Sequence, residues 1–154
     1  MRNDSFYITN RMSMTLEDMI ERVETLEEFE AKFSAEFLAN DDHAGNYLNQ
    51  LLWKYNKKAS VVSQEAMLTH SYVGNIVNGI KRNPSRDALI SICLTIGTSV
   101  EEVQYLLKYA GHAPLYVRRQ RDVIIWFGFM RQMTLDEVDS NLRERNLKPL
   151  IREQ

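Results

Sequence analysis

The chain has 154 residues, of which 19 are Lys or Arg, 21 are Asp or Glu and 44% are hydrophobic. Its length suits about one compact domain, and its few Gly and Pro residues argue against a disordered or collagen-like chain. The longest apolar run, residues 123–130, is too short to cross a membrane, and the first residues lead into no signal-peptide segment. Its one cysteine, Cys93, cannot form an intramolecular disulfide. Composition therefore predicts a soluble, helix-rich, cytoplasmic protein.

Charge is divided unevenly along the chain. Residues 1–44 contain four basic and eleven acidic residues, a net charge of −7. Residues 45–113 have a net charge of +3, and residues 114–154 have a net charge of +2. An acidic first part and a basic remainder suit a polyanionic partner for the remainder, although unevenly charged surface without functional meaning is the alternative.

Four helix starts are legible, at Thr15, Thr25, Ser99 and Thr134. Each hydroxyl residue is followed by an apolar residue and two acidic residues, a pattern that caps a helix N-terminus. The first two starts predict an acidic helical extension over residues 1–44. A break over 40–45 precedes a further helix with these residues on one face: Tyr47, Leu48, Leu51, Leu52 and Tyr55.

Residues 60–79 predict two short helices that cross at a sharp angle. Small Ser63 falls where the helices cross closely, and Gly79 suits the end of the second helix. This arrangement is typical of a helix-turn-helix, whose second helix lies in the DNA major groove. The apolar positions that would hold the two helices together are Val62, Ala66, Leu68, Val73 and Ile76.

Residues 46–110 resemble the five-helix DNA-binding domain of the Cro/C1-type (XRE, lambda-repressor-like) helix-turn-helix family. The best signature is segment 77–84, VNGIKRNP, which resembles the end of the recognition helix, the glycine, the basic loop and the proline that opens the next helix. Lys58 and Ala59 replace the family's usual Leu-Ser or Leu-Thr before the first helix of the motif. Met67 stands where the family usually has glycine, so we expect a strained turn there.

The resemblance implies that side chains near the start of the second helix meet base edges. By position these candidates are His70, Ser71, Tyr72 and Asn75. An Asn amide can form two hydrogen bonds with an adenine edge, and Tyr can contact bases or the sugar-phosphate backbone. The alternatives are a turn role for His70, bonded to backbone, and packing of Tyr72 against the first helix.

Phosphate contacts are expected from the segment before the first helix of the motif and from the loop after the second. Long cationic side chains at these places would fix the protein on the duplex without reading sequence. A solvated surface role is the alternative for the individual lysines before the motif. Arg86 also has a structural alternative, because its Arg-Asp pair recurs later in the chain. The candidates are Lys57, Lys58, Lys81, Arg82, Asn83 and Arg86.

An internal repeat aligns residues 83–115 with residues 118–150 at an offset of 35. Each copy predicts a helix opened by Arg-Asp, a turn, a capped second helix and a Pro-Leu stop. Neither copy buries its apolar side alone, so we expect the two to stack, with chance resemblance as the alternative. The residues expected to face the first copy are Ile124, Phe127, Val138 and Leu142. The alternative is that the aromatic residues of this part form a dimer surface or a partner surface.

The predicted organisation is all-α and has three parts. An acidic helical extension covers residues 1–44, the Cro/C1-like helix-turn-helix domain covers 45–114, and the C-terminal helical pair covers 115–154. The three histidines and Cys93 lack the spacing of a metal site, and no phosphate loop or nucleophile motif occurs. We therefore predict no catalytic residue, no metal and no cofactor.

The resemblance implies sequence-specific binding of double-stranded DNA by a transcriptional regulator of bacterial or phage type. A homodimer on a pseudo-palindromic site is expected by the same analogy. The alternative is a non-catalytic helical adaptor that keeps the fold and binds protein partners through the N-terminal or C-terminal helices. A weaker option is a sensor of a small molecule or peptide that uses the C-terminal repeat.

Overall fold

The computed structural model describes residues 20–33 and 43–152, which form helices and turns without a β-strand among them. The chain divides into two compact units, residues 1–39 and residues 40–154. In the first unit, α2 (Leu26–Phe33) begins after Thr25, whose Oγ1 accepts from the Glu28 amide at 3.0 Å. The start expected at Thr15 lies outside the described residues. The all-α prediction is confirmed for the part that the structure describes.

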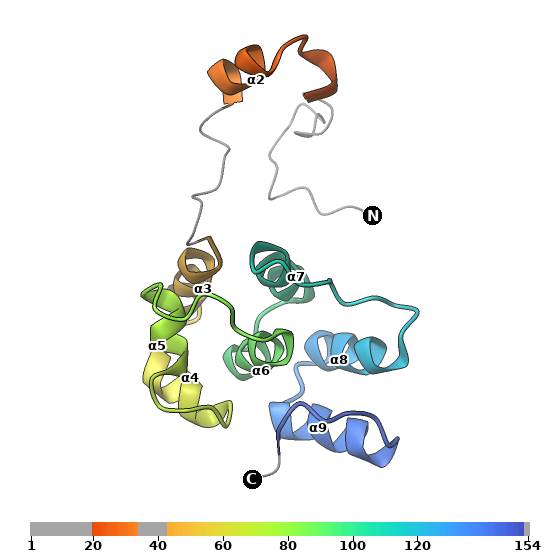
Figure 1. The fold of residues 1–154 in the computed structure, drawn as a ribbon. Helices are drawn as coiled ribbons and strands as arrows, with labels where there is room; N and C mark the ends of the chain where they lie inside the picture. The colour runs from red at the N-terminus through yellow and green to blue at the C-terminus, as the bar shows by residue number, and fades with distance from the viewer. Residues whose placement is uncertain (1–19, 34–42, 153–154) are drawn as a thin grey trace. The chain divides into compact units, whose positions relative to one another are not determined.

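The second unit contains seven described helices. In Figure 1, α3, α4 and α5 lie at one end of this unit, α8 and α9 lie at the other, and α6 and α7 lie between them. A continuous apolar core connects these helices, from Leu48 on α3 to Leu142 on α9. The helices are α3 (His43–Lys54), α4 (Ala59–Glu65), α5 (Tyr72–Val77), α6 (Arg86–Ile96), α7 (Val100–Tyr109), α8 (Gln120–Met130) and α9 (Leu135–Glu144).

Helices α3, α4 and α5 pack closely because small residues stand at their contacts. Ser63 is buried on α4, where its hydroxyl accepts from the Val73 amide at 3.0 Å and donates to the Ala59 carbonyl. A Cβ atom on Gly45 would lie 2.6 Å from the Ile76 carbonyl oxygen, so α3 and α5 approach each other at backbone distance. Helix α3 begins at His43 and contains Gly45. The break that the sequence predicted over residues 40–45 therefore does not extend to its last three residues.

The two copies of the repeat adopt matching backbone conformations. Ser99 opens α7 and Thr134 opens α9, each with a complete capping box as predicted. The left-handed position after α6 is Gly97, at φ 90°, and its counterpart 35 residues later is Gln132, at φ 55°. The left-handed position after α7, Gly111, has its counterpart in Asn146.

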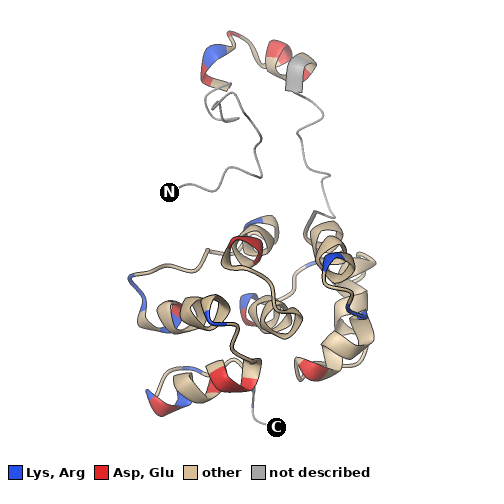
Figure 2. Ribbon diagram, turned by 180° about the vertical axis from the view of Figure 1, so that it is seen from behind, with Lys and Arg blue, Asp and Glu red and all other residues tan. Residues whose placement is uncertain are grey.

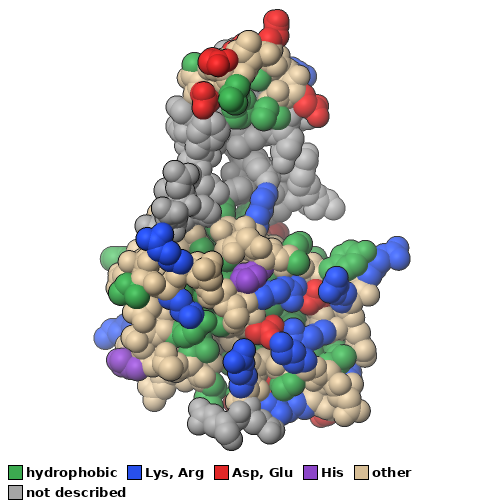
Figure 3. Space-filling model, viewed as in Figure 1, with side chains coloured by type: hydrophobic (Ala, Val, Ile, Leu, Met, Phe, Trp, Pro, Cys, Tyr) green, Lys and Arg blue, Asp and Glu red, His purple; other side chains and the backbone are tan. Residues whose placement is uncertain are grey.

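Reciprocal arginine contacts join the two copies. Arg86 donates to both carboxylate oxygens of Asp122, at 3.2 and 3.1 Å, and Arg121 donates to both oxygens of Asp87, at 3.0 and 3.1 Å. Correspondingly, α6 contacts α9 and α7 contacts α8. Because each arginine reaches the aspartate of the other copy, an approximate two-fold rotation relates the copies. Basic and acidic side chains gather over α6 and α8 in Figure 3.

The residues expected to face the first copy differ in burial. Val138 and Leu142 are fully buried, and Ile124 is half-buried. Phe127 is 44% exposed, so the expectation that it faces the first copy is wrong. It lies on a side of α8 without a packed helix among the described helices of the second unit, whereas Phe129 belongs to the core and is 5% exposed.

Candidate nucleic-acid interface

A tight turn connects α4 to α5 and sets the direction of α5. The Met67 backbone has φ 62°, in the left-handed region that usually favours glycine, so the strain expected there is present. The Leu68 amide donates to the Ser63 carbonyl at 2.9 Å, which closes the turn. The Met67 side chain is 60% exposed and does not fill the core. The turn therefore brings α5 across α4 while leaving one side of α5 partly exposed.

The four predicted base-contact residues lie together at the start of α5. His70 and Ser71 are exposed in the turn before the helix, and Tyr72 and Asn75 are half-buried on its first turn. The Asn75 side-chain amide lies 3.5 Å from the Ser71 hydroxyl, so these two side chains share one face. The Nζ atom of Lys81 lies 5.0 Å from the centre of the Tyr72 ring, within cation–π range.

Cationic residues stand at both ends of this helix pair. Lys57 and Lys58 are exposed just before α4. Lys81 and Arg82 follow α5, where the Lys81 amide donates to the Asn75 carbonyl at 2.9 Å and so fixes the direction of the loop. Asn83, the next predicted phosphate contact, is exposed in the same loop.

Arg86 occupies a different environment from the other predicted phosphate contacts. Its Nε donates to the Ala113 carbonyl at 2.9 Å, and its two terminal nitrogens bond Asp122. One of these nitrogens also donates to the Pro114 carbonyl. Since its guanidinium nitrogens are engaged within the protein, Arg86 serves the contact between the two copies, the structural alternative that the repeat suggested.

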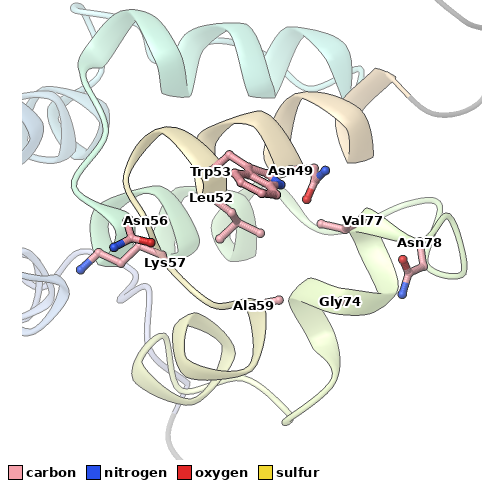
Figure 4. Close-up of a pocket in the computed structure, with 9 residues that line it drawn as sticks. All are labelled: Asn49, Leu52, Trp53, Asn56, Lys57, Ala59, Gly74, Val77 and Asn78. Atoms are coloured by element: carbon pink, nitrogen blue, oxygen red, sulfur yellow. The ribbon is translucent and has the colours of Figure 1, made fainter.

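A pocket of about 360 Å³ lies between α3 and α5, next to the outer side of α5. Figure 4 shows Asn49 and Trp53 on α3 above this pocket, with Gly74 and Val77 on α5 and Asn78 directly after it. Trp53 is 80% exposed, which is unusual for so large an apolar ring. Trp53 was not among the residues predicted from sequence, although Asn49 and Trp53 follow helical spacing on the side of α3 away from its apolar face.

Acidic groups near this surface are few, and one of them, Glu102, is bound within the fold. Helices α3, α4 and α5 contain one acidic residue, Glu65 (Figure 2). On α7, Glu102 accepts from the Lys54 ammonium and the Tyr55 hydroxyl, both at 2.6 Å. Burial alone would raise the pKa of Glu102, but bonds from Lys54, Ser99 and Tyr55 outweigh it and hold that pKa below its ordinary value. Glu102 is therefore a charged structural link between α3 and α7.

Other kinds of site find no support in the part of the chain that the structure describes. No cluster of His, Cys, Asp or Glu there is arranged to hold a metal ion. Cys93 is fully buried, and burial raises the pKa of its thiol to about 12. None of the described helices is both long and apolar enough to span a bilayer. Comparison with models of protein families, with curated proteins and with solved structures gave no match to this chain.

Proposed function

We propose that this chain binds double-stranded DNA in a sequence-specific manner, as a transcriptional regulator of bacterial or phage type. Helices α4 and α5 would act as a helix-turn-helix of the Cro/C1 kind, with α5 in the major groove. The observation that carries the proposal is the crossing of these helices, fixed by the bond between Ser63 and the Val73 amide. That crossing leaves the polar side of α5 partly exposed between two cationic segments.

Base reading is assigned to the exposed turn before α5 and the partly exposed first turn of that helix. Asn75 and Ser71 share a face there, with His70 and Tyr72 beside them. Gly74 supports close approach of a base edge, because no heavy atom lies within 4 Å of the position where its Cβ would stand. The window contains an asparagine but no arginine, so an adenine-containing half-site suits it better than a guanine-rich one.

Phosphate binding is assigned to the cationic segments at either end. Lys57 and Lys58 would hold one stretch of backbone, and Lys81, Arg82 and Asn83 would hold another. Trp53, at the pocket beside the outer side of α5, would add a ring contact to a sugar. One helix-turn-helix reads one half-site, so we propose that a homodimer binds a pseudo-palindrome.

Selection of duplexes from a random library with the purified protein tests the proposal directly. We expect enrichment of one motif that contains adenine at a fixed position of each half-site. Recovery without any motif, even at low salt, would contradict DNA reading and favour the adaptor alternative. The same selection with Asn75→Ala should lose preference at one position, because this change removes a base contact that is worth about 1–3 kcal/mol.

The salt dependence of affinity tests the phosphate contacts separately. Replacing both Lys81 and Arg82 with Ala should weaken binding to all duplexes alike. It should also reduce the slope of log affinity against log salt by about 1.8, or about 0.9 for each lost contact. The matched control replaces Arg118 and Arg119, an adjacent exposed pair that precedes α8, and should leave the slope unchanged. Equal slopes for both double variants would remove the loop after α5 from the interface.

A further inference from the structure

The two-fold relation between the copies pairs helix α8 with helix α6. One face of α6 packs against α4, and the equivalent face of α8 differs. Helix α6 contacts α4, α7 and α9, whereas α8 contacts α7 and α9. The contact of α6 with α7 corresponds to that of α8 with α9, and the contact of α6 with α9 corresponds to that of α8 with α7. The contact between α6 and α4 has no equally extensive counterpart among the described helices of the second unit, so one face of α8 lacks a packed helix from that unit.

Burial at equivalent positions identifies that face. Ala88 and Ile92 on α6 are 7% and 0% exposed, but their counterparts on α8, Val123 and Phe127, are 41% and 44% exposed. One turn further along α8, Met130 is 55% exposed. Val123, Phe127 and Met130 follow the spacing i, i+4, i+7, so they form one continuous apolar line, which we call the α8 stripe.

The first copy shows what such a face packs against. Ala88 and Ser91 of α6 line the same hollow as Ala66 and Met67, which follow the last turn of α4. Helix α4 packs on α6, whereas the counterpart face on α8 keeps larger apolar side chains without a packed helix from the second unit. The fold thus presents a helix-binding face twice but supplies a helix for only one of the two.

Charge around the α8 stripe indicates what kind of helix would bind there. Arg118 and Arg119 are exposed before α8, and the Arg131 guanidinium lies 4.8 Å from the centre of the Phe127 ring at its far end. The only acidic residue between positions 113 and 135 is Asp122, which is buried and bound to Arg86. Two copies packed through this face would bring arginines together, whereas a helix bearing carboxylates would be attracted.

We propose that the α8 stripe binds an amphipathic helix of a partner protein, whose apolar side is flanked by Asp and Glu residues. The apolar side chains of that helix would pack on Val123, Phe127 and Met130 in the manner of a helix in a groove. Its carboxylates would pair with the arginines at either end of the stripe. This binding does not depend on the proposed DNA function, since the stripe lies on α8 and the proposed DNA surface lies on α3 to α5.

The probe is a synthetic peptide of about 20 residues, long enough to be helical in water, with Leu along one face and Glu on both flanks. A second peptide carries Lys in place of each Glu. Amide shift changes in the full chain should cluster at residues 119–131 with the Glu peptide and be weak with the Lys peptide. Arg131→Glu should reduce this preference by weakening the first complex and strengthening the second.

A matched pair of valine substitutions separates the stripe from general surface effects. Val123→Glu should weaken binding of the Glu peptide by about ten-fold, because it removes an apolar contact and adds a repelling charge. Val61→Glu, at a valine of nearly equal exposure (42%) on α4, should leave it unchanged. Both proteins should fold as the parent does, since both valines are already partly exposed.

Three results would overturn the proposal. These are shift changes outside α8, equal binding of the Glu and Lys peptides, and self-association of the chain that Val123→Glu abolishes. The last result would assign the face to a second copy. Val123→Glu should also retain the parent's DNA affinity, so loss of peptide binding with DNA binding intact is distinct from failure of the proposed DNA function.

Discussion

The α6–α7 hairpin and the α8–α9 hairpin have the same capping box at the start of the second helix, the same left-handed turn positions and the same arginine contacts, but different surroundings. Helix α6 is buried along nearly its whole length, because α4, α7 and α9 surround it. On α8 the buried residues are confined to the sides that face α7 and α9. The two hairpins are therefore most alike in structure where they contact each other. They differ where the first hairpin contacts the rest of the unit.

Equivalent contacts in the two hairpins can also use different side chains. In the first hairpin, the Gln104 side chain accepts from the Leu115 amide at 2.8 Å and donates to the Leu115 carbonyl. In the second, Asp139 accepts from the Leu150 amide at 2.6 Å and also from the next amide. A carboxylate cannot donate, so the second hairpin exchanges one bond to a carbonyl for a second amide. The contact between the helix and the Pro-Leu segment is kept in both.

The largest expected effect on stability comes from comparing a core residue of the second hairpin with a residue on its exposed face. Phe129→Ala should lower the free energy of unfolding by about 3–5 kcal/mol, because its ring is 5% exposed and truncation leaves a cavity. Phe127→Ala should cost less than about 1 kcal/mol, since the ring is 44% exposed. Urea denaturation followed by circular dichroism measures both. Equal losses would mean that the Phe127 face is covered in solution.

The two reciprocal ion pairs should differ in energy because they differ in burial. Asp122→Ala should lower the free energy of unfolding by about 3 kcal/mol, since it leaves Arg86 and the Tyr116 amide without their buried acceptor. Asp87→Ala should cost about 1 kcal/mol, because the Asp87 side chain is 23% exposed and water can replace part of its bond to Arg121. Denaturation in urea ranks the two. A larger loss for Asp87 would contradict the burial argument.

Substitutions at two glycines should change stability by smaller amounts and in opposite directions. A Cβ atom on Gly128 would lie 2.4 Å from a methyl group of Val138, so Gly128→Ala should cost about 1–3 kcal/mol by forcing α8 and α9 apart. Its counterpart in the first hairpin is Cys93, so the helices of the second hairpin approach more closely at this point. Gly74→Ala is the control: its Cβ would meet nothing within 4 Å, and we expect a gain of about 0.5–1 kcal/mol in helix stability. Thermal melting distinguishes the two signs.

The smallest expected effect concerns the two capping boxes at acid pH. Glu102 has a lowered pKa in the folded chain, so its contribution to stability is complete above its ordinary value of 4.5 and is lost as the pH falls through the lowered value. Glu102→Gln should therefore flatten the loss of melting temperature between about pH 7 and about pH 3. Glu137 caps α9 from an exposed position, and Glu137→Gln should change that slope less. Identical slopes for both variants would contradict this assignment.

Local features of the second unit could be predicted from the sequence, because short-range chemistry determines them. The capped starts of α7 and α9 follow from a hydroxyl with an acid three residues later, and the buried Ser63 follows from a small polar residue at a helix crossing. The exposure of Phe127 could not be predicted in the same way. Helical spacing identifies an apolar face, but it does not say whether another helix covers that face.

The relative orientation of the two copies also could not be predicted from the sequence. A repeat of Arg-Asp at a fixed offset is compatible with copies stacked by translation or related by a rotation. Only the observed pairs, Arg86 with Asp122 and Arg121 with Asp87, distinguish these arrangements. Trp53 was missed for a related reason, since its place on the polar side of α3 becomes informative only once its ring is seen to be uncovered.

The reciprocal ion pairs have a consequence for the order in which the chain folds. The pairs join residues 36 and 34 positions apart, and one of these loops lies inside the other. Once the first pair has formed, the second closes with almost no further loss of chain entropy, so the two should form in a single step. Arg121 also binds the Lys148 carbonyl, 39 residues beyond the end of α7 at Tyr109. During synthesis, the first hairpin therefore stays without its pairs to Arg121 and Asp122 until 13 further residues have left the ribosome, and Arg121 lacks its Lys148 bond until 39 have done so.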